Sequence, residues 1–160
     1  MKTMLMSCLL VGAIILSGTA YAEWMWTHGN IGEVEYPANC TYKNFGWGLD
    51  IDQKSGNWNW IHLPVPSKAG STWGAQYIRL QFYTGSADAF VSEIHVYNGA
   101  TKKKEFKGLS ISNGWKDLQF DLGSKMIFNK GMGISIKIGA GVEMMSHRFI
   151  FSAAGANFVL

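Results

Sequence analysis

The chain has 160 residues, of which 48% are hydrophobic and 14% aromatic, and this length suits one domain with a genuine core. Its 14 Lys and Arg residues against 11 Asp and Glu residues give a formal net charge of +3. This nearly even balance of basic and acidic residues excludes the strongly basic surface that attracts nucleic acid or anionic membranes. We therefore expect neither as a partner.

Residues 1–22 have the pattern of a secretory signal peptide. Lys2 supplies the positive start, an apolar run covers residues 9–16, and Ala20-Tyr21-Ala22 forms a small-x-small cleavage site. An uncleaved anchor is the disfavoured alternative, because the run is shorter than the roughly 20 residues that span a bilayer. We therefore expect cleavage after Ala22, one mature domain over residues 23–160 without a membrane span, and a secreted or periplasmic product.

Beyond Glu23 the chain alternates apolar and polar residues, which predicts strands with one face on a core and the other towards water. In chain order, the clearest alternating runs cover residues 77–83, 90–97, 116–122, 132–138 and 147–151. Turn residues such as Asn98-Gly99 and Asn113-Gly114 separate them. Such punctuation predicts roughly eight to ten strands in an all-β fold, an antiparallel β-sandwich of jelly-roll type.

The alternation also predicts which side chains of each strand form the core. The expected inward set is Ile78, Leu80, Phe82, Ile94, Val96, Leu118, Phe120, Ile134, Ile136 and Ile138. The opposite sides of two of these strands carry polar and aromatic side chains: Tyr77, Arg79, Gln81 and Tyr83 on one, Glu93, His95 and Tyr97 on the other.

Several motifs run through the expected domain. Residues 24–29 give a Trp-x-x-x-His-Gly start, residues 60–66 give a Trp-x-His-x-Pro-x-Pro element, and residues 94–99 with 106–109 give a hairpin pattern. Together they resemble a family of small secreted bacterial and fungal proteins known only as a domain of unknown function. The resemblance implies a β-sandwich and brings no activity, ligand or catalytic residue. Asn98 stands where the family pattern has aspartate, a change that a turn position tolerates.

Cys40 is the only cysteine that remains after cleavage at the predicted site, so the mature chain forms no internal disulfide. Free cysteines are often buried and inert, and we favour that interpretation. The alternatives are an intermolecular disulfide and a nucleophile, although nothing near Cys40 in the sequence favours activation. A homo-oligomer through Cys40 or through exposed sheet edges therefore stays open.

No motif predicts catalysis, a cofactor or a metal ion, and we expect a protein that is not an enzyme. The histidines (His28, His62, His95 and His147) lack the short spacings of metal ligands and are expected to be structural or exposed. Residues 50–56 resemble the start of a calcium loop, but Lys54 and Ile61 stand where oxygen ligands are needed. A polar turn is therefore the favoured interpretation of this segment.

Tryptophan is the distinctive residue type, with six of the 7 lying between Trp24 and Trp73. Most single tryptophans are expected in the core or at its ends. Aromatic rings beside hydrogen-bonding side chains also suit a sugar, whose C–H faces stack on rings and whose hydroxyls need partners. A ligand site is expected to draw on Trp58, Trp60, Tyr77, Arg79, Tyr83, His95 and Tyr97.

Two hypotheses of function follow from these observations. The leading one is a secreted, non-catalytic binding module whose ligand is a glycan or the cell-envelope surface. The alternative is a structural, self-assembling protein of the envelope or extracellular space that has no small-molecule ligand.

Overall fold

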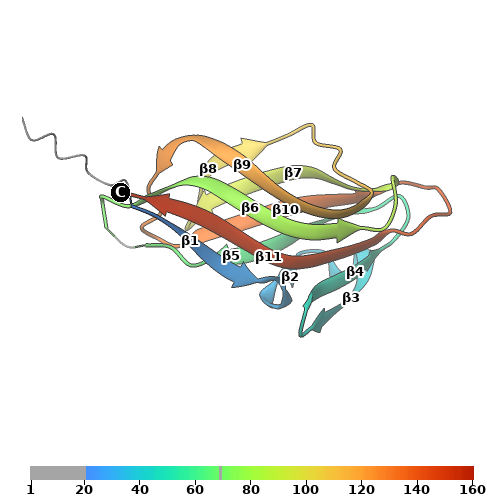
Figure 1. Ribbon diagram of the computed structural model, residues 1–160. Helices are drawn as coiled ribbons and strands as arrows, with labels where there is room; N and C mark the ends of the chain where they lie inside the picture. Colours follow the sequence, from blue (N-terminus) through green and yellow to red (C-terminus); the bar gives the residue numbers. More distant parts are fainter. Residues whose placement is uncertain (1–20, 69) are drawn as a thin grey trace, which may run out of the picture.

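The computed structural model describes residues 21–68 and 70–160, which form two antiparallel sheets packed face to face (Figure 1). Residues 1–20 of the predicted signal peptide lie outside the described residues. The elements in chain order are β1 (Ala22–His28), the 3-10 helix η1 (Gly29–Ile31), β2 (Glu33–Val34), the 3-10 helix η2 (Pro37–Asn39), β3 (Cys40–Phe45), β4 (Gly48–Gln53), β5 (Trp58–Val65), β6 (Gly74–Thr84), β7 (Ala89–Asn98), β8 (Thr101–Phe106), β9 (Gly114–Met126), β10 (Met132–Ala140) and β11 (Arg148–Val159).

The first sheet has the order β3-β4-β11-β6-β9, with β1 also paired to β11, and the second has the order β2-β5-β10-β7-β8. Strands β4 to β11 supply the orders β4-β11-β6-β9 and β5-β10-β7-β8, which is the double Greek key of a jelly roll. The predicted antiparallel sandwich of jelly-roll type is therefore confirmed. The strands exceed the predicted number because β2 has only two residues and β1 and β3 extend the first sheet.

The core lies between the two sheets and contains the residues that the alternation predicts. Eight of the ten predicted side chains are fully buried, and Leu118 and Phe120 are partly buried against the same cluster because β9 is an edge strand. β11 adds three more buried aromatic side chains, Phe149, Phe151 and Phe158. Apolar burial contributes roughly 25 cal/mol per Å², so this shared cluster is the main force that holds the sheets together.

A β-bulge in β11 reverses the alternation halfway along the strand. Phe151 pairs with Phe82, but the next pair is Ala153 with Gln81, so Ser152 is an extra residue. Without it, the two-residue period would turn Ala154 outwards; with it, Ala154, Ala156 and Phe158 face the core. The bulge consequently places Ala153 and Gly155 on the outer face.

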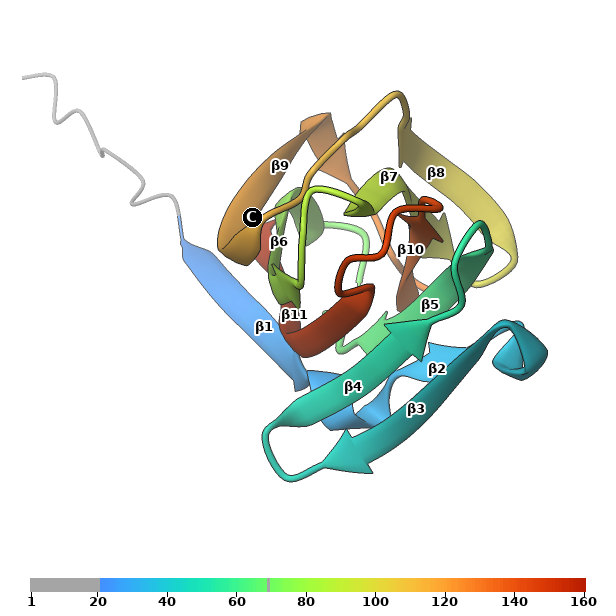
Figure 2. The same ribbon diagram turned by 90° about the vertical axis from the view of Figure 1, so that its right-hand side faces the viewer.

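One edge of β11 is shared by two strands from different parts of the chain. β4 pairs with Arg148–Phe151 and β1 with Ala153–Val159, while β6 covers the opposite edge. Gly29 and Gly48 meet the backbone of Phe151 where the two strands approach, and a Cβ atom at either position would clash there. The end-on view shows β3 and β4 extending beyond the rest of the sandwich from this junction (Figure 2).

Candidate functional site

The seven predicted ligand-binding residues lie on two opposite outer faces of the sandwich. Tyr77, Arg79 and Tyr83 point outwards from the first sheet, whereas Trp58, Trp60, His95 and Tyr97 point outwards from the second. The buried cluster of both sheets separates the two groups. The structure therefore does not bring them together into one site, and each face has to be considered separately.

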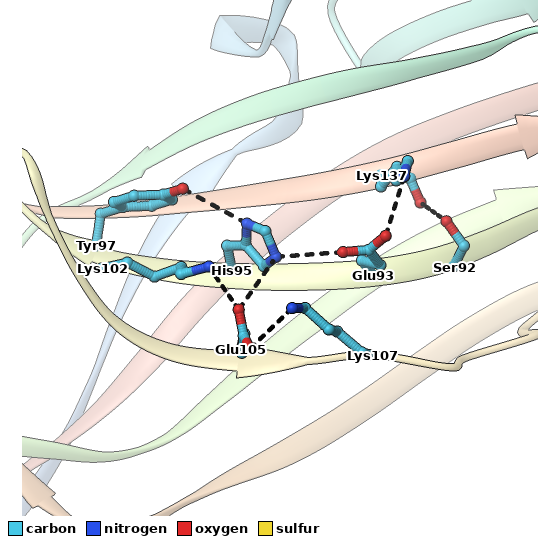
Figure 3. A network of polar contacts seen from close by, with 8 residues as sticks. All are labelled: Ser92, Glu93, His95, Tyr97, Lys102, Glu105, Lys107 and Lys137. Carbon is cyan, nitrogen blue, oxygen red and sulfur yellow. Dashed lines mark hydrogen bonds and ion pairs between the residues drawn. The ribbon is translucent and has the colours of Figure 1, made fainter.

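The outer face of the second sheet carries a closed network of charged side chains, which we call the His95 network (Figure 3). Lys137 Nζ bonds Glu93 Oε1 at 3.0 Å, and Lys107 Nζ lies 2.9 Å from Glu105 Oε1. His95 sits between the two acids, with Nε2 at 3.4 Å from Glu93 Oε2 and 3.8 Å from Glu105 Oε2. Each charge is therefore paired with a neighbour on β7, β8 or β10, or with Lys107 directly after β8.

These partners perturb the acids and the histidine in a consistent way. The hydrogen bond from Lys137 lowers the pKa of Glu93, and those from Lys102 and Lys107 lower the pKa of Glu105 to about 2. Burial lowers the pKa of His95, since desolvation disfavours the imidazolium, and nearby Lys102 acts in the same direction. At neutral pH the network therefore holds charged acids around a neutral histidine.

The two tryptophans of this face are engaged by the same network. The Trp60 ring packs on His95 with centroids 4.6 Å apart, and Lys137 Nζ lies 5.8 Å from the Trp60 centroid and 5.3 Å from that of Trp58. Trp58 also makes an edge contact with Tyr36 at 5.0 Å. Trp60 is therefore packed against protein groups, which favours a structural role for it, whereas Trp58 keeps 45% of its surface exposed at the end of β5.

Glu35, His62 and Ser135 form a hydrogen-bonded chain beside the network. Glu35 Oε2 lies 3.0 Å from His62 Nε2, and His62 Nδ1 lies 2.8 Å from Ser135 Oγ. A carboxylate, an imidazole and a hydroxyl hydrogen-bonded in this order also form the catalytic triad of serine hydrolases. Acyl transfer also needs free N–H donors for an oxyanion, but Ser135 lies on β10, which pairs with β5 on one side and β7 on the other. The backbone N–H groups around Ser135 are already used in sheet pairing. The three hydrogen-bonded side chains therefore connect the segment after β2 to β10.

The outer face of the first sheet presents a tryptophan with a free side. Trp26 of β1 pairs with Gly155 of β11, and a Cβ atom at Gly155 would lie 2.6 Å from Cε3 of the indole. The ring therefore lies on bare backbone, which only glycine permits. Trp24 stacks beside it, with centroids 5.4 Å apart and planes 24° apart. Trp26 keeps 40% of its surface exposed, so this platform is open to solvent.

An open groove of about 280 Å³ begins at this platform; we call it the Trp26 groove, and it is lined by Trp26, Thr27, His28, Gln81 and Ala153. The ion pair of Arg79 and Asp117 lies beside Gln81. Arg79 binds Asp117 through Nε at 2.6 Å and Nη2 at 2.8 Å, and Gln81 Nε2 donates to Asp117 Oδ2 at 3.2 Å. These bonds lower the pKa of Asp117 and raise that of Arg79, so both stay ionised.

A second open groove, of about 440 Å³, lies on the same sheet where β3 and β4 extend outwards; we call it the hairpin groove, and it is lined by Thr41, Tyr42, Lys43, Phe45, Asp50, Asp52, Ser146 and Arg148. Arg148 holds Asp50 in a two-point ion pair, with Nε at 2.9 Å and Nη2 at 2.7 Å. Phe45 and the exposed Trp47 stack almost in parallel, 4.8 Å apart and 7° from coplanar. This groove therefore also combines aromatic rings with a fixed charged pair.

A model of a family of unknown function, DUF6623, matches residues 21–148. The chain belongs to this family. The match spans the first ten strands and the first residue of β11, and it agrees with the resemblance inferred from the tryptophan, histidine and proline motifs. No curated protein matches the sequence.

Several solved structures are similar to this DUF6623 protein in architecture. The C-terminal CBM6 of LamC, a laminarinase from Zobellia galactanivorans, is 9% identical with a TM-score of 0.49, covering 84% of this chain and 99% of that one. The carbohydrate binding module CBM6cm-2 of Cellvibrio mixtus lichenase 5A, solved with cellotriose, is 11% identical with a TM-score of 0.48, covering 82% and 95%. A Stig cyclase from Fischerella sp. TAU is 9% identical with a TM-score of 0.45, covering 89% and 91%. Likenesses this distant carry no argument about a ligand.

Sequence reasoning missed Trp26, although the signal was present. Trp24, Trp26 and His28 alternate along β1 and therefore share one face, like the strands that were used to predict the site. What the sequence does not contain is the contact between Trp26 and Gly155, which depends on the register of β1 against the bulged β11.

Cys40 matches the favoured interpretation of a buried thiol. It is 6% exposed and packs in the core cluster, and Asn59 Nδ2 donates to its sulfur at 3.5 Å. Burial raises the pKa of Cys40, which disfavours the reactive thiolate. An intermolecular disulfide at this position is not supported, and oligomerisation through Cys40 would require local opening of β3.

Among residues 21–68 and 70–160, no three His, Cys, Asp or Glu side chains are placed to share a metal ion. Asp50, which opens the segment resembling a calcium loop, is instead paired with Arg148. The part of the chain that the structure describes also has no helix of the length and apolarity needed to cross a membrane.

Proposed function

We propose that this DUF6623 protein is a secreted, non-catalytic module that binds a glycan through the Trp26 groove. The observation that carries the proposal is the Trp26 ring, which lies on Gly155 with one side open to solvent. A flat indole offers apolar area to the C–H face of a sugar ring. His28 and Gln81 line the same groove and offer hydrogen bonds to the hydroxyls.

The charges beside the groove favour a neutral glycan. Arg79 and Asp117 neutralise one another in a two-point pair, so neither is left as a free counter-charge for an acidic or basic sugar. Their outer lone pairs and N–H groups remain available to hydroxyls, because both side chains are partly exposed. A preorganised polar pair of this kind orients a neutral ligand with little loss of side-chain freedom.

The test is binding of neutral glycans, measured on an array and by calorimetry with the exported protein. We expect the wild type to bind, Trp26→Ala to lose binding, and Trp58→Ala to keep it, since Trp58 is similarly exposed but lies on the other face. Thermal melts of all three proteins control for unfolding. Absence of binding by the wild type, or equal binding by Trp26→Ala, would overturn the proposal. If the protein then also forms concentration-dependent oligomers, the self-assembling alternative is favoured.

A further inference from the structure

We infer that the glycan site continues from the Trp26 groove into the hairpin groove, so that its ligand is an extended, neutral sugar chain lying along β11. This inference rests on the proposed function and specifies the kind of glycan. Terminal monosaccharide recognition, in contrast, would use the Trp26 groove alone.

The register of β11 places both grooves on one continuous surface. Gln81 and Ala153 line the Trp26 groove, and Asp50 and Arg148 line the hairpin groove. Ala153 pairs with Gln81, and Arg148 pairs with Asp52 beside Asp50, and all these side chains point outwards from the same sheet. At about 3.3 Å per residue, Arg148 and Ala153 lie roughly 16 Å apart along the strand, less the shortening at the bulge. That span is longer than a single pyranose ring.

The surface between the grooves suits a sugar chain. Ile150 points outwards there and pairs with Tyr83 of β6, and both side chains are largely covered by their neighbours, so they form a low apolar floor. Tyr83 in turn contacts Trp115, the most exposed of the tryptophans at 62%, with ring centroids 5.6 Å apart. A chain crossing this floor would rest on apolar side chains and expose its hydroxyls to the polar groups at either end.

The hairpin groove repeats the chemistry of the Trp26 groove. Phe45 supplies a ring, Thr41 and Ser146 supply hydroxyls, and Arg148 supplies N–H donors around its ion pair with Asp50. Its two cations, Lys43 and Arg148, are balanced by two carboxylates, Asp50 and Asp52. The charges thus cancel, as they do beside Trp26, which matches a neutral chain.

Both grooves have volumes close to those of known ligand sites. Sites that enclose small molecules have volumes of roughly 300–1,000 Å³. The hairpin groove, at about 440 Å³, lies within that range by itself, and the Trp26 groove, at about 280 Å³ and open, falls just short of it on the same face of the sheet. One chain that occupies both grooves gains from the second contact without a second loss of translational freedom.

Calorimetry with oligosaccharides of graded length tests this inference. The probes are cello-, laminari-, manno- and xylo-oligosaccharides, each from the disaccharide to the hexasaccharide. We expect affinity to rise with length, and Thr41→Ala and Asp52→Ala, which pair across β3 and β4 on the outer face, each to lower hexasaccharide affinity, by about tenfold when combined, while disaccharide affinity is unchanged. Both side chains are exposed on an edge hairpin, so folding should be preserved, and a thermal melt verifies it.

The possible results separate this inference from the proposed function. If the disaccharide and hexasaccharide bind equally tightly, or if the double variant binds the hexasaccharide like the wild type, the extended site is wrong and the Trp26 groove stands alone. If no probe of any length binds, the proposed function fails instead. Trp26→Ala should weaken binding at every length.

Discussion

At the scale of single residues, the candidate site depends on a glycine, Gly155, which has no side chain. Gly155 is buried beneath the Trp26 ring, and the backbone there is in extended conformation on a bulged strand. Any larger residue at this position would stand between the ring and the sheet. The orientation of the platform is therefore set by Gly155 as much as by Trp26 itself.

Gly155→Ala should weaken glycan binding although it touches no ligand. The new Cβ atom would lie 2.6–3.0 Å from three indole atoms, so the ring must tilt away from the sheet. We expect at least about tenfold weaker binding and a changed Trp emission spectrum, and calorimetry with fluorescence checks both.

Gly133→Ala is the matched control for this variant. Gly133 also lies within a central strand, but its Cβ would meet only Tyr97 Cβ, at 4.0 Å. Wild-type binding by Gly133→Ala is expected. Unchanged binding by Gly155→Ala would show that the Trp26 platform is not the contact surface.

The His95 network predicts a loss of stability in acid. The pKa of His95 is lower in the folded state than in the unfolded chain. As the pH drops below about 6.5, the unfolded chain therefore takes up a proton first, and the free energy of unfolding decreases as the pH decreases. The titratable groups around His95 are Glu93, Glu105, Lys102, Lys107, Lys137 and Tyr97. Glu105, with a pKa of about 2 against 4.5, extends the decline in the same direction into the range between those values.

Urea titrations between pH 8 and pH 3 would measure this dependence. We expect His95→Gln to flatten the curve just below pH 6.5, and Glu105→Gln to flatten it only at the acidic end. A wild-type curve that rises on acidification through this range would contradict the predicted direction of both shifts.

At the scale of elements, the junction of β1, β4 and β11 needs two residues without side chains. Gly29→Ala should destabilise the protein by about 1–3 kcal/mol, because its Cβ would clash with the Phe151 backbone, which the centre of a sheet holds in place. Gly46→Ala is the control, since nothing lies within 4 Å of a Cβ there. Chemical denaturation measures both, and equal stability of the two variants would mean that the junction is looser than described.

Sequence alternation predicted the faces of β6, β7 and β10 because the pleat of a strand is a local property. It could not predict which strands share a sheet, since that depends on pairings between distant segments. β6 and β7 are neighbours in the chain, yet the jelly roll places them in opposite sheets, so Arg79 and His95 lie on opposite faces. The predicted site was divided for this reason.

The bulge in β11 shows the same limit on a smaller scale. Ser152 is an ordinary strand residue in the sequence, and its hydroxyl bonds Gln81 O at 3.1 Å only in the folded sheet. No local pattern marks it as the residue where the alternation restarts. The register of Gly155, and with it the Trp26 platform, was therefore beyond prediction from the sequence.

At the scale of the whole molecule, stability rests on one core shared by both sheets. Leu80→Ala should lower the free energy of unfolding by about 2–5 kcal/mol, because Leu80 is fully buried at the centre of the first sheet. Gln119→Ala, on the exposed side of β9, should change it by less than about 0.5 kcal/mol. Denaturant unfolding of both variants checks the assignment, and a neutral Leu80→Ala would mean that the core lies elsewhere.

Export is the other prediction at this scale. A mature chain starting at Glu23 would keep all of β1 except its first residue, so removal of residues 1–22 leaves the sheet pairing of Trp24 and Trp26 in place. Intact-mass measurement of the exported protein is expected to give the mass of residues 23–160. A mass that includes Lys2 would show that the N-terminal segment is retained.

The position of β11 in the first sheet governs when the molecule can fold. This strand joins β1, β4 and β6, yet a ribosome makes it after the ten other strands of the described residues. The growing chain therefore lacks β11, the strand that completes the first sheet, until the end of the domain has been made. Most contacts in the fold also join residues far apart in sequence, which slows folding. We therefore expect the chain to remain incompletely folded during synthesis, a state that would suit the predicted passage through a secretion channel.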